Sequence, residues 1–193
     1  MWGQLITRRV NPDLVIRQAF IPDERLMKLL AKEAISSIKG SVKSNIIVQR
    51  KNGILIYKAT PVGIYSFGIL KRISPDGKPY EELKDTTLNK VRKWKGITRG
   101  PSFILRETSQ HIFEGLHIKS FTIAPRGGKK IVIGWSGEDE EIANKQETGF
   151  TTINPVTEYF GVQGLKDVTI PARPFRGFQR EFVDLFHSVF QQF

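Results

Sequence analysis

The sequence predicts an α+β domain in which a long N-terminal helix and shorter helices pack on a small antiparallel sheet, with a long basic loop or arm. Three observations predict this class: an amphipathic stretch near the N-terminus, two strand-like runs joined by glycines, and short helical patterns around them. The 193 residues suit a single domain, within which residues 65–100 form the basic loop or arm.

Residues 22–40 carry the signals of the long helix. Pro22 and Asp23 stand at its start, and Lys39 and Gly40 at its end. The apolar residues between them recur at spacings of three and four: Met27, Leu30, Ala31, Ala34, Ile35 and Ile38. We expect this stripe to pack on a sheet or on another helix.

The next segment contains an Asn-Gly pair, Asn52 and Gly53, between two apolar runs. This pattern is typical of a β-hairpin, although a helix-to-strand corner fits it too. From residue 65 to residue 100 the chain becomes basic and rich in turns, with a turn at Pro75, Asp76 and Gly77. Its second half holds a group of cationic side chains around one tryptophan: Lys84, Lys90, Arg92, Lys93, Trp94, Lys95 and Arg99.

The second half of the chain alternates helical and strand-like patterns. Residues 102–116 place four side chains on one helical face: Leu105, Thr108, Ile112 and Leu116. Residues 118–136 contain two strand-like runs joined by a glycine-rich turn, which predicts a hairpin. Residues 137–149 begin with acidic side chains and end at Gly149, as a short helix does.

Residues 150–168 look irregular, because Pro155, Gly161 and Gly164 interrupt them. The chain closes with a terminal strand or helix. On a helix, four phenylalanines would share one stripe: Phe178, Phe182, Phe186 and Phe190. Such a stripe could be part of the core or could dock on a neighbouring subunit, and both interpretations stay open.

The charge is distributed unevenly along the chain. The net charge is +11. Residues 1–100 carry 20 Lys and Arg against 8 Asp and Glu, a balance of +12, whereas the other 93 residues carry 10 against 11, a balance of −1. A basic face or arm in the first half could therefore meet a polyanion. Lysines and arginines around Trp94 could neutralise phosphates while the indole stacks on a base. A solvated loop explains the same composition, and no sequence-reading DNA- or RNA-binding motif is present.

Catalysis finds little support in the residue types. The chain has no cysteine, and its three histidines have neither metal-ligand spacing nor a marked carboxylate partner. Asp76, Glu82 and Lys84 are the residue types of a metal-dependent nuclease site, but they fall in one turn-forming stretch without strands to make them converge. Residues 124–130 resemble a phosphate-binding loop only in composition, since they join two strand patterns. We therefore expect no enzymatic activity, no cofactor and no metal.

No segment is apolar over the length that a membrane span requires, and the first 20 residues lack the pattern of a signal peptide. We expect neither a membrane-spanning segment nor secretion.

The stretch Ile170, Pro171, Ala172, Arg173, Pro174 and Phe175 combines two prolines with a central arginine. Each proline restricts its own φ and favours extended backbone in the preceding residue, so a fixed bend that aims the last helix is expected. Arg173 could cap carbonyl groups or pair with Glu147 or Glu158, with packing inside the subunit preferred over a salt bridge between subunits.

The same stretch carries a resemblance to a known family. Residues 170–178, "IPARPFRGF", closely resemble the closing "IPARPFLG" of the phage virion morphogenesis family, the Mu-like tail-completion or neck proteins. Arg176 stands where leucine is usual. Residues 77–87, "GKPYEELKDTT", resemble the family's "G-x-x-W-x-P-L-x-x-x-T", with Tyr80 for tryptophan and Glu82 for proline.

Two further segments resemble the family in the same order along the chain. Residues 104–113, "ILRETSQHIF", are similar to "L-x-D-T-G-x-L", with three replacements: Glu107 for aspartate, Ser109 for glycine and His111 for leucine. Residues 143–149, "ANKQETG", are similar to "A-x-x-H-Q/E-x-G", with Gln146 for histidine and Glu147 retained. The resemblance spans about residues 22–190.

This resemblance implies a structural protein of the virion. Members of the family are similar in fold to tail-completion subunits and assemble as rings, commonly hexamers, between the head connector and the tail tube. It implies other neck and tail proteins as partners and no catalysis. The residues of the closing motif and the phenylalanine stripe then become candidates for subunit packing, and the basic arm could meet DNA in the lumen or an adjacent ring. The alternative is a basic protein that binds nucleic acid without sequence preference.

Overall fold

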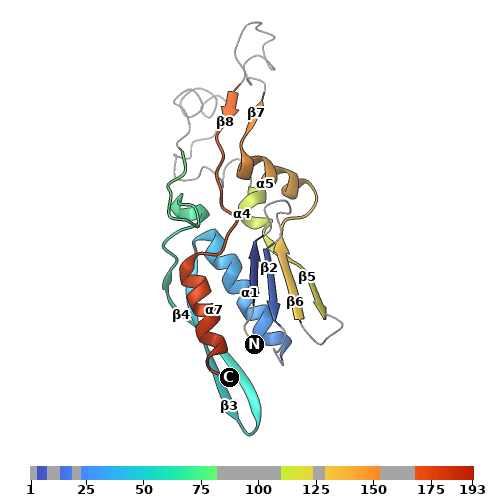
Figure 1. Ribbon diagram of the computed structural model, residues 1–193, viewed down its shortest axis with the longest axis vertical. Helices are drawn as coiled ribbons and strands as arrows, with labels where there is room; N and C mark the ends of the chain where they lie inside the picture. Colours follow the sequence, from blue (N-terminus) through green and yellow to red (C-terminus); the bar gives the residue numbers. More distant parts are fainter. Residues whose placement is uncertain (1–3, 8–13, 19–22, 82–109, 124–128, 153–167) are drawn as a thin grey trace, which may run out of the picture.

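The computed structural model describes residues 4–7, 14–18, 23–81, 110–123, 129–152 and 168–193, and it confirms the α+β class. Helix α1 (Glu24–Lys39) is central: it contacts the four-stranded sheet through β6 (Lys129–Gly134) and the C-terminal helix α7 (Arg180–Phe190). Figure 1 shows an elongated arrangement, with one hairpin projecting from one end and a small two-stranded sheet at the other.

The four-stranded sheet has the order β1-β2-β6-β5, and every neighbouring pair is antiparallel. The predicted hairpin supplies β5 (His117–Ile123) and β6, whereas β1 (Gln4–Thr7) and β2 (Leu14–Gln18) come from the N-terminus. Sequence patterns did not predict these two N-terminal strands. Strand β6 is buried at Ile131 and Ile133, and these side chains face α1 in the core.

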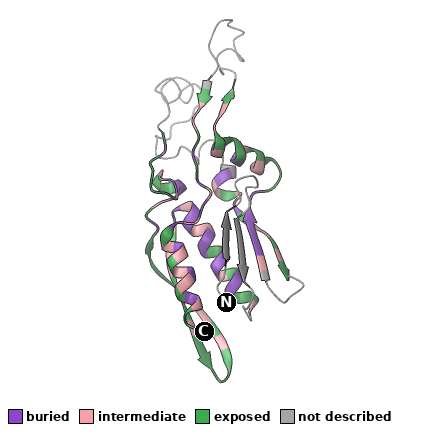
Figure 2. Cartoon of the chain, in the orientation of Figure 1, coloured by how far each residue is buried: buried purple, intermediate pink, exposed green. Residues whose placement is uncertain are grey.

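Helix α1 begins and ends where its signals predict. The Asp23 carboxylate caps the N-terminus by accepting from the Arg25 N–H at 2.8 Å, and Gly40 ends the helix in the left-handed conformation. The predicted apolar stripe faces the core, with Ile35 partly buried and the other five members buried. The burial colours of Figure 2 follow this face of the helix.

The Asn-Gly segment forms a β-hairpin and not a helix-to-strand corner. Strands β3 (Val42–Lys51) and β4 (Ile54–Ile64) pair over their full length. Asn52 and Gly53 both have positive φ, 52° and 78°, as a tight two-residue hairpin turn requires. The hairpin packs on α1 and α7 near its base, where Ile46 is buried, and its far end projects beyond the other elements in Figure 1.

The chain then passes through the 3-10 helix η1 (Ile69–Lys71) to the predicted turn at residues 75–77. The short helix α4 (Gln110–Glu114) and the helix α5 (Glu138–Thr148) follow, each within its expected segment. Strands β7 (Phe150–Thr152) and β8 (Val168–Ile170) form an antiparallel pair. The expectation of an irregular stretch over residues 150–168 is therefore wrong at both of its ends, because pairing with a distant segment stabilises these short strands.

The chain closes with a helix, α7, rather than a strand. Phe182 and Phe186 are fully buried, and Phe178 and Phe190 pack partly buried against the same core. Neighbouring rings of this stripe lie 4.6 to 6.3 Å apart between centroids. In this chain the phenylalanine stripe therefore packs against its own subunit, on α1 and β3.

Candidate functional site

The closing motif, residues 170–178, connects β8 to α7 and lies against α5. Arg173 is buried, with 1% of its surface exposed. Its backbone N–H donates to the Gln146 carbonyl at 2.9 Å, and its Nη1 donates to the Gln146 side-chain oxygen at 3.0 Å. A guanidinium is costly to bury, and these bonds fix its position next to α5.

Glu147 fastens the next two residues of the motif. One of its carboxylate oxygens accepts the backbone N–H groups of Phe175 at 2.9 Å and of Arg176 at 3.2 Å. Burial raises the pKa of the Glu147 carboxyl, and the two N–H donors together with the Arg176 charge oppose that rise. Arg176 also donates from Nη1 to the Asn144 side chain at 2.9 Å. Glu147 therefore binds the backbone of the motif, whereas Arg173 contacts Gln146. Glu158 lies outside the described residues.

Gly149, which ends α5, permits the closest approach between the two segments. A β-carbon on Gly149 would lie 2.8 Å from the Ala172 nitrogen and 2.9 Å from the Ile170 carbonyl oxygen. Its φ of 76° is also one that residues with side chains rarely adopt. Residues 143–149 and residues 170–178, two segments far apart in the sequence, thus form one joint.

The other two segments of the resemblance reach the same joint. Tyr80 is 5% exposed and belongs to the same buried cluster as Ile112, Trp135 and Phe175. Burial and the Glu147 charge raise the pKa of its phenol, and the Arg173 charge opposes the rise. On the other side, Phe175 meets Trp135 edge to face at 5.4 Å between centroids. The Trp135 indole N–H donates to the Ile112 carbonyl at 2.8 Å. Tyr80, Ile112, Gln146 and Arg173 are therefore parts of one buried hub, which we call the motif hub.

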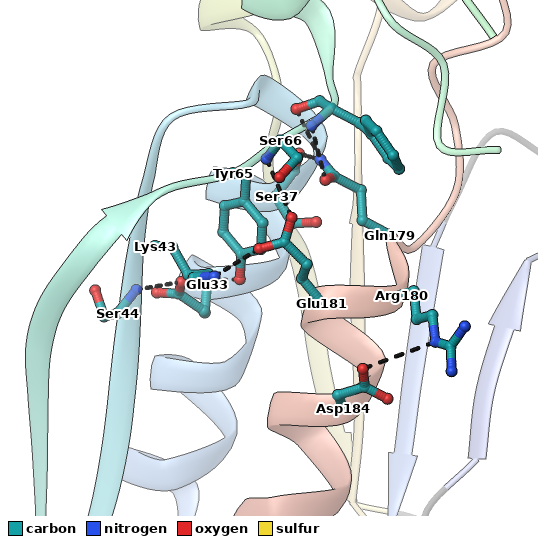
Figure 3. A network of polar contacts seen from close by, with 11 residues as sticks. Glu33, Ser37, Lys43, Ser44, Tyr65, Ser66, Gln179, Arg180, Glu181 and Asp184 are labelled. Atoms are coloured by element: carbon teal, nitrogen blue, oxygen red, sulfur yellow. Dashed lines mark hydrogen bonds and ion pairs between the residues drawn. The ribbon is translucent and has the colours of Figure 1, made fainter. Parts of the chain in front are cut away.

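A second junction holds α7 to α1 and to the hairpin (Figure 3). The Gln179 amide donates to the Ser37 and Phe67 carbonyls, the latter at 2.9 Å, and accepts the Phe67 N–H at 3.2 Å. It thus ties the start of α7 to the end of α1.

Glu181 and Glu33 complete this junction. The Glu181 carboxylate accepts from Lys43 Nζ at 2.6 Å and from the Ser66 N–H at 3.2 Å, and these bonds lower its pKa. The Glu33 carboxylate accepts from the Tyr65 hydroxyl at 2.9 Å and the Ser44 N–H at 2.7 Å. Burial and the adjacent Glu33 carboxylate raise the pKa of Tyr65, so its phenol stays protonated.

The cationic group predicted to meet DNA or a partner, Lys84 to Arg99 with Trp94, lies outside the described residues, as do Glu82 and Lys84 of the nuclease pattern. Asp76 is described and lies in the Ser74 to Gly77 turn, where a hydrogen bond from the Ser74 hydroxyl lowers its pKa. In the described ranges, no group of three His, Cys, Asp or Glu side chains is placed to hold a metal ion. In the same ranges, no helix is long and apolar enough to cross a membrane.

Comparisons with known proteins add no assignment, since no family model, no curated protein and no solved structure matches this chain.

Sequence reasoning named the closing motif but missed most of its partners. Trp135 and Gln179 stand in segments whose patterns indicate only a strand end and a helix start. A buried glutamine or tryptophan acquires its role from the backbone groups it meets, and those come from distant segments.

Proposed function

We propose that the chain is a structural virion protein of a tailed bacteriophage, a tail-completion or neck subunit that forms a homo-oligomeric ring, a hexamer in our proposal, and joins the tail to the head connector. Its location would be the virion, after assembly in the host cytoplasm, and it would act without catalysis or cofactor. Other neck and tail proteins would be its partners.

One observation carries this proposal: the motif hub. Each of the four segments that resemble the family contributes a residue to one buried region. Gln146 bonds Arg173, and Tyr80, Ile112 and Phe175 belong to one hydrophobic cluster, in which Trp135 contacts both Ile112 and Phe175. This shared location supports a common structural role for the four segments. The hub also fits a mechanical role, because its buried ionic groups are engaged by backbone and side-chain hydrogen bonds.

A ring subunit needs rigid, repeatable edges, since each copy must present the same two surfaces to its neighbours. The hub and the junction around Gln179 supply such rigidity, because they fix the closing motif at one end to α5 and at the other to α1. In this proposal Arg173 and the phenylalanine stripe stabilise the subunit, and they leave the ring contacts to other surfaces.

The decisive experiment is to ask whether the protein is present in purified mature particles, and at which end of the tail. Antibody labelling of particles by electron microscopy should place it at the neck. Particle sizing of the purified protein, alone and after addition of neck components from disrupted phage, would show whether a partner surface nucleates the ring. Absence from mature particles would contradict the proposal, whereas a monomer in solution alone would not.

The alternative, a nucleic-acid-binding protein without sequence preference, is favoured by the balance of +12 in residues 1–100. Tight DNA binding at moderate salt by a strictly monomeric protein absent from virions would support it.

A further inference from the structure

The two edges of the β3–β4 hairpin differ in how their backbone groups are used. Along β3, the side chains of neighbouring elements cover the edge. The Ser44 N–H donates to Glu33 at 2.7 Å, the Val48 N–H donates to the Gln192 side-chain oxygen at 2.8 Å, and the Gln192 side-chain nitrogen donates to the Ile46 carbonyl at 3.2 Å. These bonds show that residues 44, 46 and 48 direct their backbone groups away from β4.

The opposite edge, on β4, follows from the register. Val48 lies opposite Tyr57, and Ile46 opposite Ala59. In an antiparallel pair, residues opposite each other direct their backbone groups both toward or both away from the partner strand. Tyr57 and Ala59, and by alternation Leu55, therefore direct their N–H and C=O groups outward from β4. Within the described part of the chain, no other strand pairs with this edge.

The free edge has a defined length. It begins at the turn before Ile54 and ends at Pro61, because proline has no N–H to donate to an added strand. The register also shifts at this end: Lys43 pairs with Gly63 and Ser44 with Pro61, so Val62 is an extra residue on β4. The usable edge is therefore residues 54–60, long enough for a strand of ordinary length.

The outer face beside this edge is apolar and basic. Ile54 and Ile56 are 65% and 42% exposed, and Ile47 on β3 is 37% exposed. Lys58 lies opposite Ile47, and Lys51 opposite Ile54, so both lysines share that face. The hairpin, residues 42–64, contains no Asp or Glu, and its four cationic residues are Lys43, Arg50, Lys51 and Lys58. Glu181 of α7 engages Lys43. The hairpin itself offers no carboxylate to the other three.

We propose that residues 54–60 of β4 are a strand-addition site, which takes an extended segment of a different protein that carries β-branched apolar residues and carboxylates. The added strand would pair with the outward groups of Leu55, Tyr57 and Ala59. Its apolar side chains would lie beside Ile54 and Ile56, and its carboxylates beside Lys58, while Lys51 on β3 adds to the positive charge of the same face. The exposed isoleucines favour a protein segment over nucleic acid, and the uniform positive charge disfavours the same strand of a second copy. The inference does not depend on the ring.

The direct test is amide hydrogen exchange on the full chain, with a fluorescent peptide of about eight residues in which every second residue is threonine and the positions between carry valine and glutamate, so that valines and glutamate share one face. The N–H groups of Leu55, Tyr57 and Ala59 should exchange fast in the free protein and slow when the peptide is added. Those of Ile56 and Lys58, which already bond β3, should change little and serve as internal controls.

Two variants separate strand addition from general attraction. Ala59→Pro removes one outward N–H without touching a β3–β4 ladder bond and should abolish peptide binding in fluorescence anisotropy. Lys58→Glu changes an exposed side chain and keeps every backbone N–H. It should weaken binding by about two- to fivefold, the range of one cross-strand charge pair. It should also improve binding of the matched peptide with lysine in place of glutamate.

Three results would overturn the proposal. Protection of the Leu55, Tyr57 and Ala59 amides in the free protein would mean that another part of this chain already covers the edge. Protection that grows with protein concentration would mean that a second copy covers it. If the peptide does not bind, or slows exchange only at amides other than Leu55, Tyr57 and Ala59, the edge is not a strand-addition site. Protection by a DNA duplex but not by the peptide would assign the face to nucleic acid. None of these results bears on whether the protein occurs in virions, which tests the proposed function separately.

Discussion

Gly149 and Ala172 touch through backbone alone: a β-carbon on Gly149 would lie 2.8 Å from the Ala172 nitrogen. Such contacts are tighter than real β-carbons make, so this position accepts glycine only unless the backbone shifts. The contact joins the end of α5 to the prolines of the closing motif, and it holds Gln146 and Glu147 within hydrogen-bonding distance of residues 173–176.

Gly149→Ala should therefore destabilise the fold through two effects, strain from positive φ and a backbone clash. Gly53→Ala is a control for positive φ alone, because Gly53 has nearly the same φ, 78° against 76°, but has nothing within 4 Å of the new β-carbon. The ψ of 159° at Gly149 adds to the strain there. We expect the control to lose about 1 kcal/mol and Gly149→Ala about 2 to 4 kcal/mol in free energy of unfolding. Urea unfolding followed by circular dichroism measures both. Equal losses would show that the close approach is absent.

The bond between Arg173 and Gln146 can be measured with a double-mutant cycle. Arg173→Met should cost about 2 to 4 kcal/mol in free energy of unfolding, because it removes a buried, hydrogen-bonded side chain. Gln146→Leu alone should cost less. We expect the double variant to be more stable than the sum of the two losses predicts, by about 1 kcal/mol. Arg180→Met, at a side chain 92% exposed, is the control and should be close to neutral. Strict additivity would mean that the two side chains act independently.

The Lys43–Glu181 pair should make stability depend on pH. Hydrogen bonds from Lys43 and Ser66 lower the pKa of Glu181 below its ordinary value of 4.5. The native carboxyl thus holds a proton less tightly than the unfolded one, so its contribution is complete above pH 4.5 and is lost as the pH falls through the lower native pKa.

Glu181→Gln should accordingly lose about 0.5 to 1 kcal/mol in free energy of unfolding at neutral pH, and the loss should shrink in acid. Asp184→Asn is the control, because Asp184 is exposed and lies 4.0 Å from Arg180. Urea titrations between neutral and acidic pH measure both variants. A loss that stays constant across this range would mean that the Glu181 charge contributes nothing.

The sequence predicts local structure well where the signals are local. The caps of α1 and the acidic start of α5 each act within a few residues, and both helices begin and end accordingly. The Asn52-Gly53 pair left a hairpin and a helix-to-strand corner open, and the hairpin forms. Strands β1 and β2 escaped prediction, because a four- or five-residue strand becomes stable only when it pairs with β6.

The candidate site shows the same division. Pro171 and Pro174 predict that this stretch forms neither helix nor regular strand, and residues 171–176 form neither. The partners of that stretch depend on contacts between residues about 27 positions apart along the chain, such as Arg173 with Gln146, and no local pattern encodes them. The direction of the phenylalanine stripe was equally undetermined, because a helical stripe looks the same whether it packs in its own subunit or in the next one.

The packing of the phenylalanine stripe within its own subunit can be tested by substitution. Phe186 is fully buried against its own subunit, whereas Phe193 at the end of the chain is 56% exposed. Phe186→Ala should lose about 3 to 5 kcal/mol in free energy of unfolding, and Phe193→Ala less than about 0.5 kcal/mol. Because the contacts lie within one chain, the loss from Phe186→Ala should be the same at every protein concentration at which sizing shows monomers. A loss that appears only at concentrations where subunits associate would mean that the stripe packs between subunits.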